Sequence, residues 1–155
     1  MNLFGGAAIN ILFFEEISEV FVSNIVPLLD CITFEPGEMI YKLNDFAGEM
    51  YFLHSGKVNL IYSPFFITVK TMLSGSTFGE MELLDHEPRI MTASVGEEPV
   101  VALCLKASSL RILESIVPEA IFQLRKISND KKEKYQEILS EVDEWTNKVL
   151  NTRVD

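Results

Sequence analysis

The stretch from Phe78 to Arg89 reads FGEMELLDHEPR and places a glycine before a short apolar run and an arginine after it. The pattern predicts a short helix from Glu80 to Asp85. Backbone N–H groups at a helix start attract anions, and glycine lets a ligand approach the backbone closely. Arg89 can form a bidentate pair with a phosphate, and Glu80 can accept hydrogen bonds from a sugar hydroxyl. From these residues alone, the stretch is either a phosphate–sugar site or a capped turn with an arginine on the surface.

Short apolar runs separated by turn signals surround this stretch from Cys31 to Leu105. The turn signals are pairs such as Pro36-Gly37 and Ser55-Gly56, in which proline or glycine interrupts a strand. The runs between them include 50–53, 58–62 and 65–69. Strands this short at this spacing predict an antiparallel roll or sandwich.

Helical patterns flank the predicted strands. Ser18 to Leu29 carries apolar residues at helical spacing, although Pro27 is expected to kink or split its last turn. After Lys106, Ser108 or Ser109 can cap a helix that runs to about Val117. Pro118 suits the first turn of a second, long helix.

The long C-terminal helix carries an apolar stripe with spacings of 3, 4, 3 and 4. Its members are Tyr135, Ile138, Val142, Trp145 and Val149. The stripe covers about two heptads, fewer than the three to four that indicate a coiled coil. It either packs on the strands, forms a mobile lid, or contacts another subunit in a homo-oligomer.

These patterns predict one domain over residues 1–155 of the α+β class, mainly β. We expect an antiparallel β-roll or jelly roll flanked by N-terminal helices and a long C-terminal helix. The expected boundaries are 1–30 for the N-terminal helices, 31–106 for the roll, and 107–155 for the C-terminal helices. A chain of 155 residues is long enough for one well-buried core.

The charge is acidic and unevenly distributed. Thirteen Lys and Arg residues stand against 23 Asp and Glu, a formal net charge of -10. From Arg125 onward seven basic residues balance seven acidic ones, so the excess acidity lies before Arg125. This balance argues against nucleic acid or an anionic membrane surface as the main partner. The uncharged stretch 1–14 is shorter than the roughly 20 residues a membrane span needs, so no transmembrane segment is expected.

Three motifs in order resemble the cyclic-nucleotide-binding domain family, whose fold is the β-roll of the catabolite activator. The run 78–89 resembles the family's phosphate-binding cassette, which reads Phe-Gly-Glu, then apolar residues, then Pro-Arg or Arg-Arg. FEPGEMI at 34–40 resembles its early strand turn, and EMYFLHSGKV at 49–58 resembles its next hairpin. The lead-in helices correspond to 9–29, and the resemblance spans roughly 9–119 plus a following lid helix.

The resemblance implies a role for each matching residue. Glu80 accepts a hydrogen bond from the ribose 2′-hydroxyl, and Arg89 pairs with the cyclic phosphate. The long C-terminal helix closes over the base. The implied ligand-binding residues are Leu60 and Met72 along the base, and Phe78, Gly79, Glu80, Met81, Glu82, Arg89 and Ile90 in the cassette, whose expected bounds are 78–90.

The hairpin at 49–58 looks more like the ion-channel branch of the family than the kinase or bacterial-activator branches. The resemblance thus implies a regulatory domain without enzymatic activity or a cofactor, located on the cytoplasmic side of a membrane protein. Its ligand is cAMP or, less in keeping with the sequence, cGMP. Its partners are the cyclic nucleotide and the other subunits of a parent channel or transporter.

Two residues depart from the family pattern. At Glu82 the family usually has a small neutral residue beside the phosphate. A carboxylate at about 7 Å from the phosphate, at an effective dielectric of about 20, costs roughly 2 kcal/mol unless Glu82 turns to solvent. Ile90 stands where channel relatives often place a threonine that contacts phosphate or a guanine amino group, which favours cAMP over cGMP.

Two other functions remain open. A degenerate domain of the same fold would bind no nucleotide and act as a structural coupler, with Glu80 and Arg89 paired to each other. An enzyme or hard-metal site could use the crowded acidic stretch and its histidine, namely Glu80, Glu82, Asp85, His86 and Glu87. Such metal sites usually need several histidines, and the chain has only two.

Overall fold

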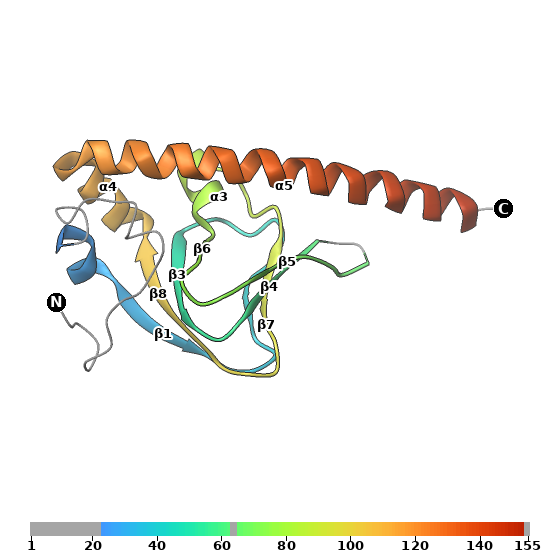
Figure 1. Cartoon of the computed structure of the whole chain (residues 1–155), viewed down its shortest axis with the longest axis horizontal. Coiled ribbons are helices and arrows are strands. Elements are labelled where there is room, and N and C mark those ends of the chain that lie inside the picture. Colours follow the sequence, from blue (N-terminus) through green and yellow to red (C-terminus); the bar gives the residue numbers. More distant parts are fainter. Residues whose placement is uncertain (1–22, 63–64, 154–155) are drawn as a thin grey trace.

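A computed structural model describes residues 23–62 and 65–153 of the chain (Figure 1). Two four-stranded antiparallel sheets form a roll, and helices cover one side of it. The first sheet has the order β1 (Asp30–Phe34), β8 (Val100–Lys106), β3 (Glu49–Ser55) and β6 (Thr77–Phe78). The second has the order β2 (Met39–Tyr41), β7 (Thr92–Val95), β4 (Val58–Tyr62) and β5 (Ile67–Met72). The expected mainly β, α+β roll is confirmed.

The helical elements are η1 (Val26–Leu28), a 3₁₀ turn, and the α-helices α3 (Glu80–Asp85), α4 (Ala107–Ile116) and α5 (Pro118–Arg153). Helix α3 has the bounds that the sequence predicts, and α5 begins at Pro118 as expected. The N-cap of α4 is Lys106, and no side chain caps it. The prediction that Ser108 or Ser109 caps this helix is therefore wrong. Strand β8 runs straight into α4, and the Ala107 N–H donates to the Gly48 carbonyl at 2.9 Å.

The N-terminal prediction is tested only in part. Residues 1–22 of the expected helices lie outside the described part of the chain. Residues 23–25 are helical, and the chain then tightens into η1, which has Pro27 at its start. The interruption that proline was expected to cause is present. The predicted strand at 65–69 begins later, at Ile67, because Phe66 adopts a left-handed turn with φ of 53°.

Strand β3 separates two hydrophobic cores. Met50 and Phe52 point into a core formed with η1, α3, α4 and the start of α5. Tyr51 and Leu53 point into the interior of the roll. Alternate residues of a strand face opposite sides, so β3 is buried on both faces because helices cover its outer one.

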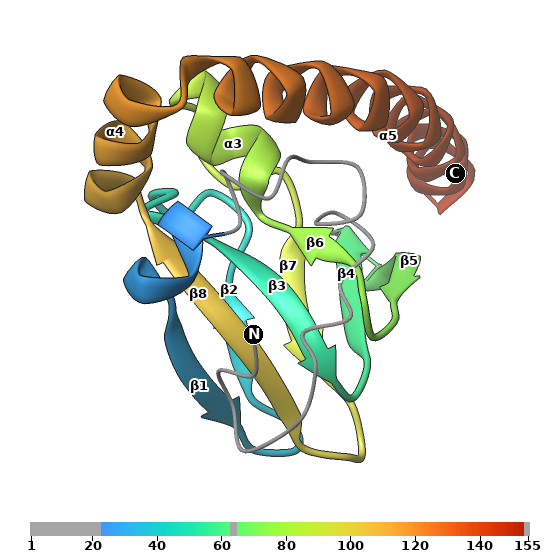
Figure 2. The same ribbon diagram turned by 60° about the vertical axis from the view of Figure 1, so that its left-hand side comes forward.

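Helix α5 is the longest element and lies across α3 and the open side of the roll (Figures 1 and 2). Its C-terminal part continues past the strands, as Figure 1 shows. Within the apolar stripe, Tyr135 is buried, whereas Trp145 is half exposed and contacts Phe65 edge-on at 5.5 Å between ring centroids. Among the helices that the structure describes, none is long and apolar enough to cross a membrane.

Candidate functional site

Helix α3 follows β6 through a turn that requires glycine. Gly79 has φ of 83°, a left-handed conformation in which side chains cause strain. A Cβ atom at this position would also lie 3.0 Å from Nη1 of Arg89. Both the backbone conformation and the close approach of the guanidinium therefore explain the glycine of the cassette.

Arg89 lies inside the protein rather than on its surface. Its side chain is 0% exposed. Nη1 donates to the Gly79 carbonyl at 2.6 Å and Nη2 to the Glu49 carbonyl at 2.5 Å. The guanidinium also lies 4.0 Å from the centroid of the Tyr41 ring, a cation–π contact. Its Nε atom has no hydrogen-bond partner. Arg89 is thus held firmly, and its Nε donor is unused.

Two carboxylates surround this guanidinium. Glu82 Oε2 lies 3.6 Å from Nη1, and Glu49 Oε1 lies 3.7 Å from Nη2. Glu82 is buried, so it does not turn to solvent. Its Oε1 accepts a 3.2 Å hydrogen bond from the Ile90 N–H, and its Oε2 accepts none. Burial raises the pKa of Glu82, an effect that the nearby Arg89 charge opposes.

Glu80 has a different partner, which comes from α5. The Nζ atom of Lys131 donates to Glu80 Oε1 at 2.8 Å and to Thr77 Oγ1 at 2.9 Å. It also donates to the Thr77 carbonyl at 3.1 Å. Glu80 is 1% exposed, and its Oε2 atom has no partner. Lys131 therefore occupies the hydrogen-bonding position that the family resemblance assigns to a ribose hydroxyl.

Helix α5 also fills the space beside the expected base-lining residues. Tyr135 and Leu139 are buried in the same cluster as Leu60 and Met72. The Tyr135 hydroxyl lies 3.8 Å from the Met72 sulfur. Cavities of about 440 and 690 Å³ remain along the two flanks of the helix, one with Met72 and the other with Arg89 in its wall. The helix thus lies in the mouth of the roll and leaves space on either side.

The structure brings most of the predicted site residues to one place. Gly79, Glu80, Glu82, Arg89 and Ile90 lie around α3, and Leu60 and Met72 lie beneath α5. Phe78 and Met81 instead point into the roll interior, where the Phe78 ring stacks on Tyr51 at 5.1 Å.

Four residues of the site are absent from the sequence-based prediction: Tyr41, Glu49, Thr77 and Lys131. Thr77 stands next to the recognised cassette, so its position in the sequence could have indicated it. Lys131 is 51 residues from Glu80. No local pattern indicates a contact over that separation.

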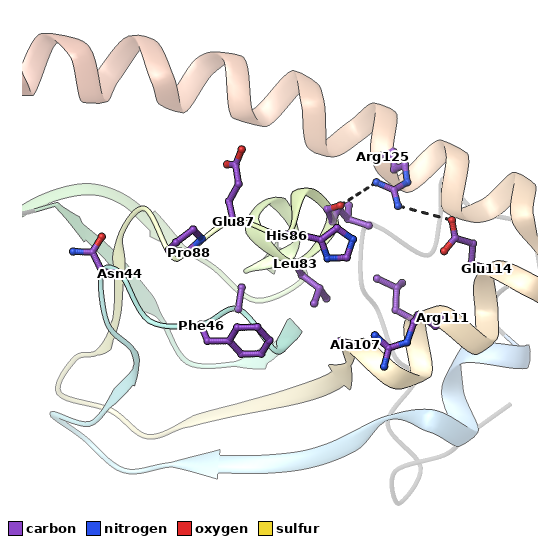
Figure 3. Close-up of a pocket in the computed structure, with 13 residues that line it drawn as sticks. Asn44, Phe46, Leu83, His86, Glu87, Pro88, Ala107, Arg111, Glu114 and Arg125 are labelled. Carbon is purple, nitrogen blue, oxygen red and sulfur yellow. Dashed lines mark hydrogen bonds and ion pairs between the residues drawn. The ribbon is translucent and has the colours of Figure 1, made fainter.

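A further cavity of about 500 Å³ lies between α3 and α4 (Figure 3), and Arg89 does not line it. Leu83 and Leu84 of α3, Phe46 of the β2–β3 connection and residues of α4 form its walls. Figure 3 shows Arg125 of α5 reaching over it. Arg125 donates to the Leu84 carbonyl at 3.1 Å and pairs with Glu114 of α4 at 3.8 Å. Arg125 thus links α5 to both α3 and α4.

The hard-metal alternative can be compared with the described residues. Within residues 23–62 and 65–153, no group of three or more His, Cys, Asp or Glu residues could hold a metal ion. Asp85 and Glu87, which the hard-metal alternative uses, instead contact Lys132 of α5 at 2.6 and 3.2 Å.

Comparison with known proteins identifies a family model and several relatives that match this chain. The family model described as "Cyclic nucleotide-binding domain" matches residues 31–115. A cAMP-dependent protein kinase regulatory subunit from Emericella nidulans is 35% identical over 80 residues, 52% of this chain and 19% of the relative. Potassium channel AKT3 from rice, Oryza sativa subsp. japonica, is 26% identical over 140 residues, 86% of this chain and 15% of the channel. The chain therefore spans less than a fifth of either relative.

The fold matches solved structures of the same kind. The catabolite activator protein of Thermus thermophilus superposes with a TM-score of 0.71 at 22% sequence identity. The match covers 84% of this chain and 62% of the activator. At this identity the likeness shows the shared fold, including the roll and the long helix that follows it.

Proposed function

The chain belongs to the family of cyclic nucleotide-binding domains, and from this premise we propose that it is a sensor in which nucleotide and helix α5 compete for one pocket. The observation that carries the proposal is the bond between Lys131 and Glu80. A ribose hydroxyl that bonds Glu80 Oε1 requires Lys131 to leave, because Glu80 is buried and Lys131 already bonds that oxygen. Binding would therefore release α5 at this point.

Further contacts join α5 to the cassette and support a helix response to the ligand. Arg125 bonds the Leu84 carbonyl, and Lys132 pairs with Asp85. A ligand that favours one arrangement of the cassette shifts the population of helix positions. The mechanism we propose differs from simple closure of a lid, since Tyr135 and Leu139 already lie against Leu60 and Met72.

We propose cAMP as the preferred ligand. Ile90 lies next to Arg89, and its side chain is hydrocarbon, so it cannot hydrogen-bond to a guanine amino group. Its backbone N–H is engaged by Glu82. A ligand without that amino group loses nothing at this position, whereas cGMP would leave a polar group unpaired.

We further propose that the domain regulates a cytoplasmic gate in a channel or transporter. The rice potassium channel supports this assignment because it matches 86% of this chain, whereas the kinase regulatory subunit matches 52%. Ile138 and Trp145 of α5 are 38% and 50% exposed. They form a surface through which subunits of the parent protein could associate.

A structural coupler that binds no nucleotide is the second candidate. The observation that favours it is that the charged side chains of the site already form ion pairs within this chain, namely Arg89 with Glu82 and Glu80 with Lys131. The pairing differs from the one that the sequence suggested, since Glu80 and Arg89 do not pair with each other.

Calorimetry with cAMP and cGMP distinguishes the two candidates. We expect heat from cAMP with the purified chain, no heat with Arg89→Ala, and tighter binding with Lys131→Ala. Lys134→Ala is the control, because Lys134 lies near Lys131 in the same cavity wall but has no bond to Glu80. Absence of heat at millimolar nucleotide in all four proteins would leave the coupler.

A further inference from the structure

We propose that Glu82 takes the place of the ligand phosphate at Arg89, and that a cyclic nucleotide binds together with a proton that neutralises Glu82. This inference deepens the proposed function and rests on it. Glu82 is then the residue that makes the nucleotide affinity of the site depend on pH.

The geometry places a carboxylate where an anionic ligand needs the guanidinium. Glu82 Oε2 lies 3.6 Å from Arg89 Nη1, and both side chains are almost fully buried, at 3% and 0% exposure. Oε2 makes no hydrogen bond, and neither does Arg89 Nε. The two groups therefore face each other as a buried ion pair with unused hydrogen-bonding capacity.

Charge counting shows what a second anion would do there. Arg89 supplies one positive charge, and its Nη1 and Nη2 atoms already donate to the carbonyls of Gly79 and Glu49. A cyclic phosphate brings one further negative charge. Glu82 and the partly exposed Glu49 already share this cation, so the phosphate would be a third anion there, and protonating the buried Glu82 relieves the repulsion.

In the described part of the chain, the surroundings of Glu82 offer no other cation. The titratable and charged groups that face it are Arg89, Glu80 on its own helix, Tyr41 from β2 and Tyr135 from α5. Lys131 is engaged by Glu80 and Thr77, and Glu49 faces the other side of Arg89. Because Arg89 alone is positive among the groups facing Glu82, a bound phosphate favours the neutral form of Glu82.

The proton has a defined position in this scheme. It comes from solvent and binds Glu82 Oε2, the oxygen without a partner. The resulting carboxyl group can donate its O–H to a phosphate oxygen, which converts a repulsion into a hydrogen bond. One nucleotide anion and one proton are taken up together, and no covalent bond of the nucleotide changes.

Calorimetry of cAMP binding between pH 5.5 and 8, in two buffers of different ionisation enthalpy, measures the proton directly. We expect uptake approaching one proton per nucleotide, and an affinity that falls by up to about tenfold per pH unit as pH rises. Glu82→Gln should bind with no pH dependence in this range. Glu87→Gln should keep the wild-type slope, because Glu87 is a half-exposed carboxylate of the same cassette that pairs with Lys132 instead.

The outcomes separate this inference from the function on which it rests. Equal binding heats in both buffers and a flat pH profile of the wild-type chain would overturn proton uptake while leaving nucleotide sensing intact. The same holds if Glu82→Gln keeps the wild-type slope. If neither the wild-type chain nor Glu82→Gln binds cAMP or cGMP at any pH, sensing fails and the inference fails with it. The wild-type measurement alone decides the matter if the variant does not fold.

Discussion

Two buried carboxylates of α3, Glu80 and Glu82, stand two residues apart but have partners in different parts of the molecule. Glu80 bonds Lys131, which belongs to α5 and is 30% exposed. Glu82 pairs with Arg89, which belongs to the cassette itself and is fully buried. The first contact breaks whenever α5 moves, whereas the second can break only if the cassette rearranges. Helix α3 thus carries two kinds of contact. The Glu80–Lys131 pair is suited to switching and is called the switching contact, and the Glu82–Arg89 pair holds the site in place and is called the holding contact.

The holding contact should give the largest effect on stability. Arg89→Ala leaves Glu82 buried without its cation and removes the two bonds to carbonyls. We expect the free energy of unfolding to fall by about 3–5 kcal/mol, as when one partner of a buried ion pair is lost. Urea unfolding followed by circular dichroism measures it. Lys106→Ala is the control because its pair with Asp30 is exposed; similar losses in the two variants would contradict the comparison.

The next effect concerns ligand affinity. Glu82→Ala removes the carboxylate beside the expected phosphate, and we expect cAMP to bind more tightly by roughly 2 kcal/mol, on the order of 30-fold. Calorimetry at pH 8, where the carboxylate is expected to be ionised and to oppose binding most, is the measurement. Unchanged affinity would show that Glu82 moves away from Arg89 when the ligand enters.

The switching contact should give a smaller loss of stability but a clear change in motion. Lys131→Ala leaves Glu80 without its cation, and we expect a cost of about 1–2 kcal/mol because Lys131 is partly exposed. Amide hydrogen exchange should become faster in α5 near position 131 and remain unchanged in β3. Lys134→Ala should match the wild-type chain; if it loosens α5 equally, the Glu80 bond is not what holds the helix.

The smallest effect is expected at Lys132, whose pairs with Asp85 and Glu87 lie at the surface. Lys132→Ala should cost roughly 0.2–1 kcal/mol, and less at high salt. The hydrogen bond to Asp85 raises the pKa of Lys132 above its ordinary value of 10.5. The stabilisation is therefore present below pH 10.5 and lost as pH rises through the higher folded pKa. Thermal melts at two salt concentrations and a pH series test both statements.

Local patterns predicted the elements that carry the site. Short apolar runs, turn residues and Pro118 predicted the roll, α3 and the start of α5, because these depend on neighbours in sequence. The direction of the Arg89 side chain depends on Tyr41 and Glu82, and the partner of Glu80 comes from 51 residues away. Such contacts have no periodicity, so the sequence could name Glu80 and Arg89 as site residues but could not predict their partners.

The length of α5 turns a small displacement at the site into a large one elsewhere. The helix runs from Pro118 to Arg153, and its last part extends beyond the roll (Figure 1). At 1.5 Å per residue, the segment from Lys131 to its end measures about 33 Å, so a tilt of about 10° at Lys131 would carry the tip through about 6 Å. Helix α5 therefore acts as a lever. If the contact between Lys131 and Glu80 is lost and the helix tilts there, its far end moves by about the length of one helical turn.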